Sequence, residues 1–260
     1  MVLPACYFYH IPKTAGMTSW QLLEWLYPEE KICPGRMWED IINVPLPVLQ
    51  TFEAFRGHFL AYLESHLDRK LTTFTILRNP VERTISHYCH VQRSPEHPFY
   101  DDARALSLAE FCAHPRTRHM VQDYQSRYLA CLGQKCPRTL ARTMTNQDFA
   151  TYKLQLALDP FPDELPPGPE LYRAARNRLQ SFVAVGISER LRESFLLIAR
   201  KLGAPNPPAF ERRNTAPNRI TAIDNRTMQI IFQCTEVDHA LYADEVTRFE
   251  HSVQGLLDTV

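Results

Sequence analysis

Residues 5–20 read ACYFYHIPKTAGMTSW, and this stretch decides the fold. Its first five residues are aromatic or small and apolar, which predicts a short buried strand over residues 5–9. The segment HIPKTAGM that follows contains proline and glycine and predicts a loop. From about Thr18 to Tyr27 apolar residues recur at helical spacing. The stretch therefore predicts a strand, a loop and a helix in succession.

A second stretch repeats this order and reads LTTFTILRNPVERTISHY, residues 71–88. Its first half is rich in β-branched and aromatic side chains, which favour a strand that ends at Arg78. Asn79 can cap the following helix, Pro80 suits the first helical position, and Glu82 completes a capping-box pattern. A strand and a helix are thus joined by a very short loop.

The remaining segments continue the alternation. Residues 53–57 and 181–186 predict two more strands. Helical patterns cover residues 107–113, 116–132, 145–158, 188–202, 221–233 and 235–251. This order predicts an α/β fold: a P-loop-like, three-layer domain with a central parallel sheet flanked by helices and a helix-rich carboxy-terminal half. We expect residues 1–260 to form a single domain, with the proline-rich acidic stretch 159–170 as a surface loop.

Composition argues against several classes of protein. The 29 basic residues are balanced by 29 acidic ones, which disfavours a broad nucleic-acid-binding surface. No segment approaches the roughly 20 apolar residues of a membrane span, and we expect no signal peptide. Seven scattered cysteines without a CxxC pair predict reduced thiols in a cytosolic protein and no zinc site. A single disulfide between Cys131 and Cys136 is the alternative.

The first loop has the features of an anion site. Ligands of parallel sheets bind at the carboxyl ends of the strands, where both loops lie. Backbone N–H groups at a helix start attract negative charge, Lys13 adds a cation, and Gly16 allows a close approach of the backbone. The loop is not a Walker A motif, because GxxxxGK[ST] is absent. An ordinary strand–helix turn with a solvated lysine is the alternative. In the second loop, Arg78 and the hydroxyl of Ser86 suit a phosphate monoester.

Together, HIPKTAGMTSW and ILRNPVERTISHY resemble the two motifs with which Golgi-type carbohydrate sulfotransferases bind 3′-phosphoadenosine 5′-phosphosulfate (PAPS). The resemblance is closest to the group of the heparan sulfate and uronyl 2-O-sulfotransferases and their bacterial relatives. It implies transfer of a sulfuryl group from PAPS to an acceptor hydroxyl. The residues that it implies for the 5′-phosphosulfate are Lys13, Thr14, Ala15, Gly16, Met17 and Thr18.

The same resemblance implies further nucleotide contacts. Arg78 and Ser86 would bind the 3′-phosphate. The later stretch RRNTAPNR, residues 212–219, is similar to a loop that closes over the nucleotide, which implies roles for Thr215 and Arg219.

Sulfuryl transfer is an in-line displacement at sulfur, and charge builds on the oxygen that bridges to the departing phosphate. Lys13 would stabilise that charge, and this chemistry requires no metal ion. The acceptor hydroxyl needs a base, and our candidate is His58 in FRGHF, because relatives carry a histidine in a similar Gly-His context. Arg56 stands where those enzymes have a second histidine, which argues against a two-histidine mechanism. A structural role is the alternative for His58, and His10 is then the second candidate base.

Several polar residues are expected outside the site. We predict that Glu82 and Arg83 are solvated on their capped helix. Gln125 and Arg127 are expected on the solvent face of an amphipathic helix, whereas Tyr128 is expected in the core.

Two other functions fit the same pattern: a P-loop-type nucleotide kinase, and a non-catalytic module that binds a nucleotide or an anionic glycan. The kinase lacks support because no apolar strand ends in a magnesium-binding aspartate. For a sulfotransferase we expect a glycan or small-molecule acceptor, no nucleic-acid partner and no membrane span. A bacterial cytoplasmic enzyme is the expected setting, and a lumenal Golgi domain trimmed of its anchor is the alternative.

Overall fold

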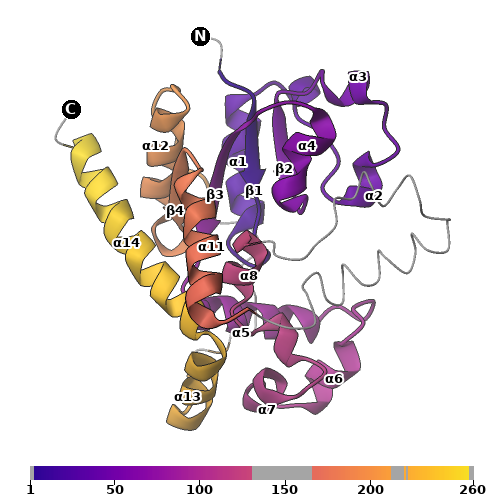
Figure 1. The fold of residues 1–260 in the computed structure, drawn as a ribbon, viewed down its shortest axis with the longest axis vertical. Helices are drawn as coiled ribbons and strands as arrows, with labels where there is room; N and C mark the ends of the chain where they lie inside the picture. The colour runs from indigo at the N-terminus through magenta and orange to yellow at the C-terminus, as the bar shows by residue number, and fades with distance from the viewer. Residues whose placement is uncertain (1–2, 131–165, 212–219, 221, 258–260) are drawn as a thin grey trace.

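The computed structural model describes residues 3–130, 166–211, 220 and 222–257. Four parallel strands form its central sheet in the order β2-β1-β3-β4 (Figure 1). The strands are β1 (Cys6–Tyr9), β2 (Ala54–Gly57), β3 (Thr72–Leu77) and β4 (Ala184–Ile187). The predicted α/β fold with a central parallel sheet is confirmed.

Helices make up most of the remaining described chain. Before the sheet is complete, the α-helices are α1 (Gly16–Leu26), α2 (Trp38–Ile41), α3 (Leu46–Leu49), α4 (Leu63–Leu67), α5 (Pro80–Val91), α6 (Tyr100–Ala105), α7 (Leu108–Ala113), α8 (Tyr124–Ala130) and α11 (Gly168–Gln180). After β4 they are α12 (Leu191–Lys201), α13 (Asn225–Cys234) and α14 (Glu236–Leu257). Short 3-10 turns cover Glu29–Lys31, Leu60–Tyr62, Arg118–Met120 and Ser188–Arg190. None of the described helices is long and apolar enough to cross a membrane.

Two helix predictions need correction, and α11 is an additional helix. The first helix begins at Gly16 rather than Thr18, because Ala15 adopts a left-handed conformation and its carbonyl accepts the N–H groups of the first turn. The helix predicted over 116–132 is broken at Asp123, whose φ of 41° is left-handed. Helix α11 was not predicted and begins inside the stretch expected to be a loop. The helix predicted over 145–158 lies outside the described residues.

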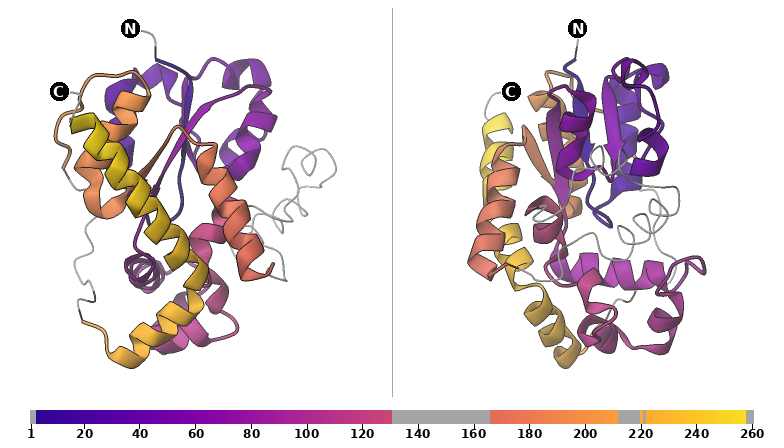
Figure 2. Two further views of the ribbon diagram at one scale, coloured as in Figure 1. Left: turned by 60° about the vertical axis from the view of Figure 1, so that its left-hand side comes forward. Right: turned by 45° about the vertical axis from the view of Figure 1, so that its right-hand side comes forward.

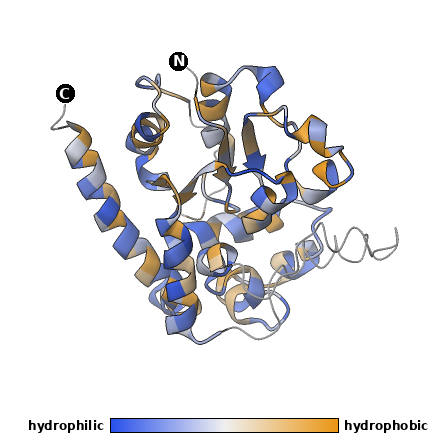
Figure 3. Ribbon diagram, turned by 45° about the horizontal axis from the view of Figure 1, so that its top comes forward, coloured by the Kyte–Doolittle hydropathy of each residue, from blue (hydrophilic) through white to orange (hydrophobic). Residues whose placement is uncertain are grey.

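Both faces of the sheet are covered by helices (Figures 1 and 2). Helices α1 and α12 lie on one face, α4 and α11 lie on the other, and α14 runs along the edge formed by β4. Phe8, Phe55 and Phe74, one from each of three strands, are fully buried in the core between these layers. In Figure 3, α14 alternates hydrophobic and hydrophilic bands, as expected for a helix with one packed and one solvated side.

A second apolar cluster lies beneath the carboxyl ends of the strands. Helices α5, α6, α7 and α13 gather there in Figure 1 and enclose buried side chains such as Ile85, Phe111 and Ile231. Helix α5 therefore has one side against this cluster and the other toward the loops that leave the sheet. The candidate site is built on that upper side.

Two buried aspartates join α8 to α14. The carboxylate of Asp238 accepts hydrogen bonds from the N–H groups of Gln125 (3.0 Å) and Ser126 (2.7 Å) and from the Ser126 hydroxyl (2.6 Å). Conversely, Asp123 Oδ1 accepts the N–H groups of Val237 (2.8 Å) and Asp238 (3.1 Å). Each aspartate thus caps the start of the other's helix, and this arrangement fixes α8 under the sheet.

We predict that Asp238→Ala lowers the free energy of unfolding by roughly 2–4 kcal/mol, because it leaves several buried donors without an acceptor. Urea denaturation measures the loss. Asp224→Ala is the matched control: Asp224 also caps a helix, through the Thr227 N–H at 2.9 Å, but from an exposed position where water can replace it. Equal losses for the two variants would contradict the role given to the buried cap.

Candidate functional site

The loop between β1 and α1 forms a cradle of backbone groups. Lys13 and Ala15 have left-handed φ angles of 73° and 66°, which turn the chain sharply before the helix. The Thr14 hydroxyl donates to the Ile11 carbonyl at 2.8 Å and closes the turn from within. Within the described chain, no acceptor is bonded to the N–H groups of Gly16 and Met17 at the first turn of α1. Such N–H groups are suited to hold an anion.

Gly16 is required where His10 packs against the loop. A Cβ built on Gly16 would lie 2.2 Å from His10 Nε2, closer than any real contact. The His10 ring is buried and also meets the Trp20 ring edge-on at 6.5 Å. Burial, His58 and Lys13 together hold the pKa of His10 well below its usual value. His10 is therefore a neutral packing residue that shapes the cradle.

Lys13 lies near three other cations, Arg78, Arg83 and Arg93. Burial lowers the pKa of Lys13 to about 8, and the charges of Arg83, Arg93 and Arg78 add to this effect. In the described part of the chain no carboxylate forms an ion pair with Lys13. A concentration of positive charge without an acidic partner for its lysine is suited to an anionic ligand.

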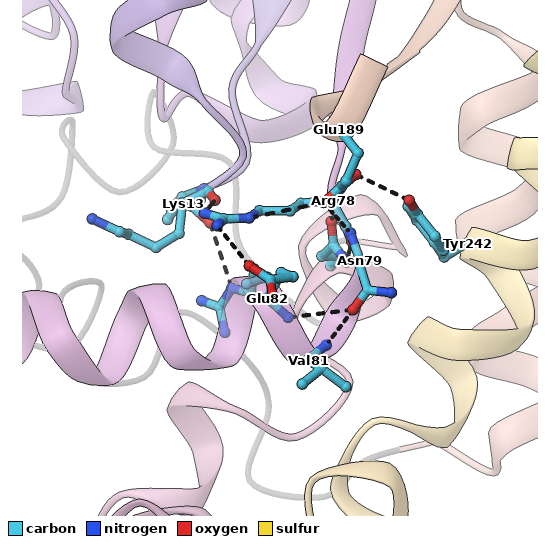
Figure 4. Close-up of polar contacts among 10 residues, drawn as sticks. Lys13, Arg78, Asn79, Val81, Glu82, Glu189 and Tyr242 are labelled. Atoms are coloured by element: carbon cyan, nitrogen blue, oxygen red, sulfur yellow. Dashed lines mark hydrogen bonds and ion pairs between the residues drawn. The ribbon is translucent and has the colours of Figure 1, made fainter. Parts of the chain in front are cut away.

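Arg78 connects the second loop to the first (Figure 4). Its Nη1 donates to the Lys13 carbonyl at 3.1 Å, and its Nη2 contacts Glu82 Oε2 at 3.3 Å. Glu189 Oε1 lies 4.0 Å from Arg78 Nε, and the other carboxylate oxygen, Glu189 Oε2, accepts the Tyr242 hydroxyl at 3.0 Å. The prediction that Glu82 is merely solvated is therefore wrong, because it pairs with Arg78 one helical turn away.

The predicted cap of α5 is confirmed. Asn79 Oδ1 accepts the N–H groups of Val81 at 3.0 Å and Glu82 at 3.3 Å. Ser86 lies one turn after Glu82 and is half-buried on the upper side of α5.

Gln125 holds the backbone of Arg78. Its Nε2 donates to the Arg78 carbonyl at 2.8 Å, and its Oε1 accepts the Arg78 N–H at 3.0 Å, as a neighbouring strand would. Only 2% of Gln125 is exposed, and Arg127 is buried as well, so the prediction of a solvent-facing pair is wrong. The reason is that α14 and its Asp238 cover the start of α8.

Arg83 is a buried part of the site that sequence reasoning missed. Only 1% of it is exposed, so the prediction of a solvated arginine is wrong. Its guanidinium donates to the Met120 carbonyl at 2.7 Å, contacts His87 Nδ1 at 2.9 Å and lies 3.7 Å above the Tyr124 ring. Burial lowers the pKa of Arg83 to about 10, so it stays charged at neutral pH. The available sequence signal was His87 four residues later, on the same helix face.

His58 lies at the end of β2, beside the end of β1. Its Nδ1 is 3.0 Å from the His10 carbonyl oxygen and 3.1 Å from the Tyr128 hydroxyl. The backbone N–H of His58 donates to the Arg36 carbonyl at 2.8 Å. A Cβ on Gly57 would lie 2.3 Å from that same carbonyl oxygen. Burial lowers the pKa of His58 to about 4, so the imidazole is neutral at physiological pH.

The side chain of Arg56 is held by residues of α1. Its Nη1 pairs with Glu24 Oε1 at 2.9 Å, and its guanidinium lies 4.8 Å from the centre of the Trp20 ring on α1. This position therefore contributes a packing cation and no second base, as its identity suggested.

The remaining predicted residues are placed as follows. Thr14 and Thr18 are buried in the loop and the first turn of α1, whereas Met17 is exposed at the rim. Thr215 and Arg219 lie outside the described residues, as do Cys131 and Cys136. The described cysteines are free thiols. No group of histidine, cysteine, aspartate or glutamate side chains in the described ranges is arranged to hold a metal ion.

Comparison with known proteins identifies the family of the chain. A model of the Sulfotransferase family matches residues 6–157, which is more than half of the 260-residue chain. The chain belongs to the sulfotransferase family. Members transfer a sulfuryl group from PAPS to a hydroxyl-bearing acceptor, so this sulfotransferase is a PAPS-dependent enzyme, and the kinase and non-catalytic alternatives are set aside. No curated protein matches the chain.

We predict that Gly16→Ala weakens the binding of adenosine 3′,5′-bisphosphate (PAP), the desulfated donor, at least tenfold. The new Cβ must displace either the buried His10 ring or the loop backbone, which costs roughly 1–3 kcal/mol. Calorimetry measures the affinity and thermal unfolding measures the stability. Gly255→Ala is the control, because a Cβ there meets open space and suits the helix. Normal affinity in Gly16→Ala would show that the loop does not hold the donor.

Proposed function

We propose that this sulfotransferase binds the 5′-phosphosulfate of PAPS in the loop from Lys13 to Thr18 and the 3′-phosphate at Arg78 and Ser86. Lys13 stabilises the leaving phosphate, and His58 is the general base for the acceptor hydroxyl. Thr215 and Arg219 are proposed to complete the nucleotide site.

The observation that carries this proposal is the convergence of the open N–H groups of α1 with Lys13 and three arginines at one edge of the sheet. The donor is a polyanion with phosphate groups at both ends of its ribose. A site with a helix start on one side and several desolvated cations on the other matches that charge distribution. Burial lowers the pKa of Lys13, and its positively charged neighbours lower it further before the donor binds.

In the proposed mechanism the sulfuryl group is transferred in a single in-line displacement at sulfur. The acceptor oxygen forms a bond to sulfur while the bond between sulfur and the bridging phosphate oxygen breaks. The electron pair of that bond stays on the phosphate, where the Lys13 ammonium and the N–H groups of Gly16 and Met17 stabilise it. The proton of the acceptor passes to Nε2 of His58, the ring nitrogen that faces away from the His10 carbonyl.

We propose a carbohydrate hydroxyl as the acceptor, in an enzyme of the 2-O-sulfotransferase type. The support is the Gly57-His58 pair between the two donor motifs, at the end of the strand beside β1. Residues 1–260 are proposed to act as one domain in a bacterial cytoplasm, where the free thiols of the described chain stay reduced. A panel assay with labelled PAPS tests the acceptor, using an unsulfated uronic-acid polysaccharide, a simple alcohol and a tyrosine peptide. Transfer to the peptide alone would overturn the carbohydrate proposal.

We predict a bell-shaped pH dependence of kcat/KM. His58 must be neutral to accept a proton, so activity falls as the pH drops toward its pKa of about 4. Lys13 must be protonated to meet the developing charge, so activity falls as the pH rises through its pKa of about 8. In the pH profile of kcat the alkaline limb should lie at higher pH than in the profile of kcat/KM. The reason is that the bound polyanion favours the charged form of Lys13 and so raises its pKa.

Two variants assign the alkaline limb. Lys13→Ala should lower kcat by about 10²–10³-fold while PAP still binds, because the contact strengthens only in the transition state. Lys13→Arg keeps a permanent cation, so the alkaline limb should disappear at reduced activity. If the limb persists in Lys13→Arg, another group causes it and the role of Lys13 is wrong.

A further prediction concerns the 3′-phosphate. Ser86→Ala should lower the affinity for PAP roughly tenfold and leave the affinity for adenosine 5′-monophosphate unchanged, because only PAP carries the 3′-phosphate. Arg78→Ala should lower the affinity for both ligands, since Arg78 also donates a hydrogen bond to the Lys13 carbonyl. The loss should be larger for PAP, which alone carries the 3′-phosphate. Calorimetry on both ligands measures the losses. Equal losses of the two ligands in Ser86→Ala would overturn the 3′-phosphate assignment.

A further inference from the structure

One side of His58 is held by two oxygen atoms from different elements. The His10 carbonyl, at the end of β1, lies 3.0 Å from Nδ1, and the Tyr128 hydroxyl, on α8, lies 3.1 Å from the same nitrogen. The two rings of His58 and Tyr128 meet edge-on, with centres 6.3 Å apart and planes at 88°.

These contacts fix the tautomer of His58. A carbonyl oxygen can only accept, so at 3.0 Å from the His10 carbonyl Nδ1 must carry the hydrogen. A lone pair on Nδ1 would face the carbonyl lone pairs and repel them. The Tyr128 oxygen then accepts from the same N–H, which forms a bifurcated hydrogen bond. The lone pair of the neutral ring consequently lies on Nε2, the nitrogen that a base would use.

The Tyr128 hydroxyl is itself held firmly in place. Only 3% of Tyr128 is exposed, and its ring is stacked on Tyr124 at 5.9 Å and meets Tyr9 edge-on at 5.7 Å. The Tyr9 hydroxyl donates to the Tyr128 carbonyl at 2.6 Å, which ties α8 to β1. Asp238 fixes the start of the same helix. The hydroxyl oxygen is therefore part of a rigid frame.

We propose that Tyr128 is a positioning residue for His58: its hydroxyl oxygen holds Nδ1–H and stabilises the imidazolium that forms when Nε2 takes the acceptor's proton. The inference rests on the proposed role of His58 as base. When the ring becomes positive, its N–H groups become stronger donors, and hydrogen bonds to a charged donor are about twice as strong as neutral ones. Two neutral oxygens, from His10 and Tyr128, thus serve where many other enzymes place a carboxylate.

Among the described residues, no charged group shifts the pKa of His58. The His10 ring, which directly follows β1, lies 4.8 Å from the His58 ring, and the pKa of His10 is held well below its usual value, so His10 stays neutral. On the β2 side, Arg36 and Arg56 turn their guanidinium groups toward the Trp20 ring instead. The pKa of His58 is lowered by burial and raised by its bond to the His10 backbone.

Tyr128→Phe tests the proposal, because it removes one oxygen and keeps the ring. With PAPS and the unsulfated uronic-acid polysaccharide, kcat should fall roughly 5–10-fold while PAP affinity stays normal. In the PAP complex, nitrogen-15 NMR of the histidines should show the His58 pKa lowered by about 0.5–1 unit, because the imidazolium has lost an acceptor. Tyr27→Phe is the matched control, because it also removes one hydroxyl of a buried tyrosine, which donates to the Pro4 carbonyl at 2.6 Å. Pro4 lies before the amino end of β1, whereas His58 lies beside the carboxyl end.

A double-mutant cycle separates this proposal from the one on which it rests. In a His58→Ala background, Tyr128→Phe should cause no further loss of kcat, because the group it supports is gone. A loss of equal size in both backgrounds, or an unchanged His58 pKa in Tyr128→Phe, would overturn the positioning role. Full turnover in a folded His58→Ala protein would instead overturn the base, and the NMR titration would still decide whether Tyr128 holds the ring.

Discussion

The hydrogen bond from Arg78 to the Lys13 carbonyl joins two loops that lie 65 residues apart in the chain. A parallel sheet brings the ends of β1 and β3 to the same edge, but it does not fix the loops beyond them. Arg78 supplies that connection because its own backbone is held on both sides by Gln125. Gln125 in turn depends on α8, whose start is capped by Asp238 from α14. The candidate anion site is thus maintained by contacts that reach as far as Asp238 in α14.

The site gathers positive charge with little negative charge to offset it. Arg83 is held by a carbonyl, a histidine and the face of Tyr124, with Asp238 as a more distant negative charge, whereas Arg78 pairs with Glu82 directly. Removing cations from water without acidic partners costs free energy, which a bound polyanion recovers. If these cations hold the donor as proposed, the free sulfotransferase gives up some stability for affinity toward PAPS, and donor binding is expected to stabilise the fold.

The strands and the positions of the two loops after β1 and β3 follow from the sequence, because β-branched runs, Pro80 and Asn79 act over a few residues. Gln125 and Arg83 could not be placed in this way, since their burial depends on Asp238 and Met120, far away in the sequence. Helix α11 is a different case: Leu171, Ala175 and Leu179 repeat at the spacing of one turn and are all buried. That pattern was readable, but the prolines before it favoured a loop.

The two histidines at this edge, His10 and His58, differ in their surroundings, and this difference separates a packing residue from the proposed base. Both rings are neutral at physiological pH, because burial lowers both pKa values. His10 Nε2 lies where a Cβ of Gly16 would be, so the loop blocks its approach to an acceptor. His58 instead directs its protonated nitrogen at a backbone carbonyl and leaves Nε2 for proton transfer. As the proposed base, with a pKa near 4, His58 is weak, so in the proposed mechanism the proton leaves the acceptor as the new bond to sulfur forms, when the acidity of the acceptor rises steeply. In that mechanism, correct placement of the ring contributes more to the rate than its basicity.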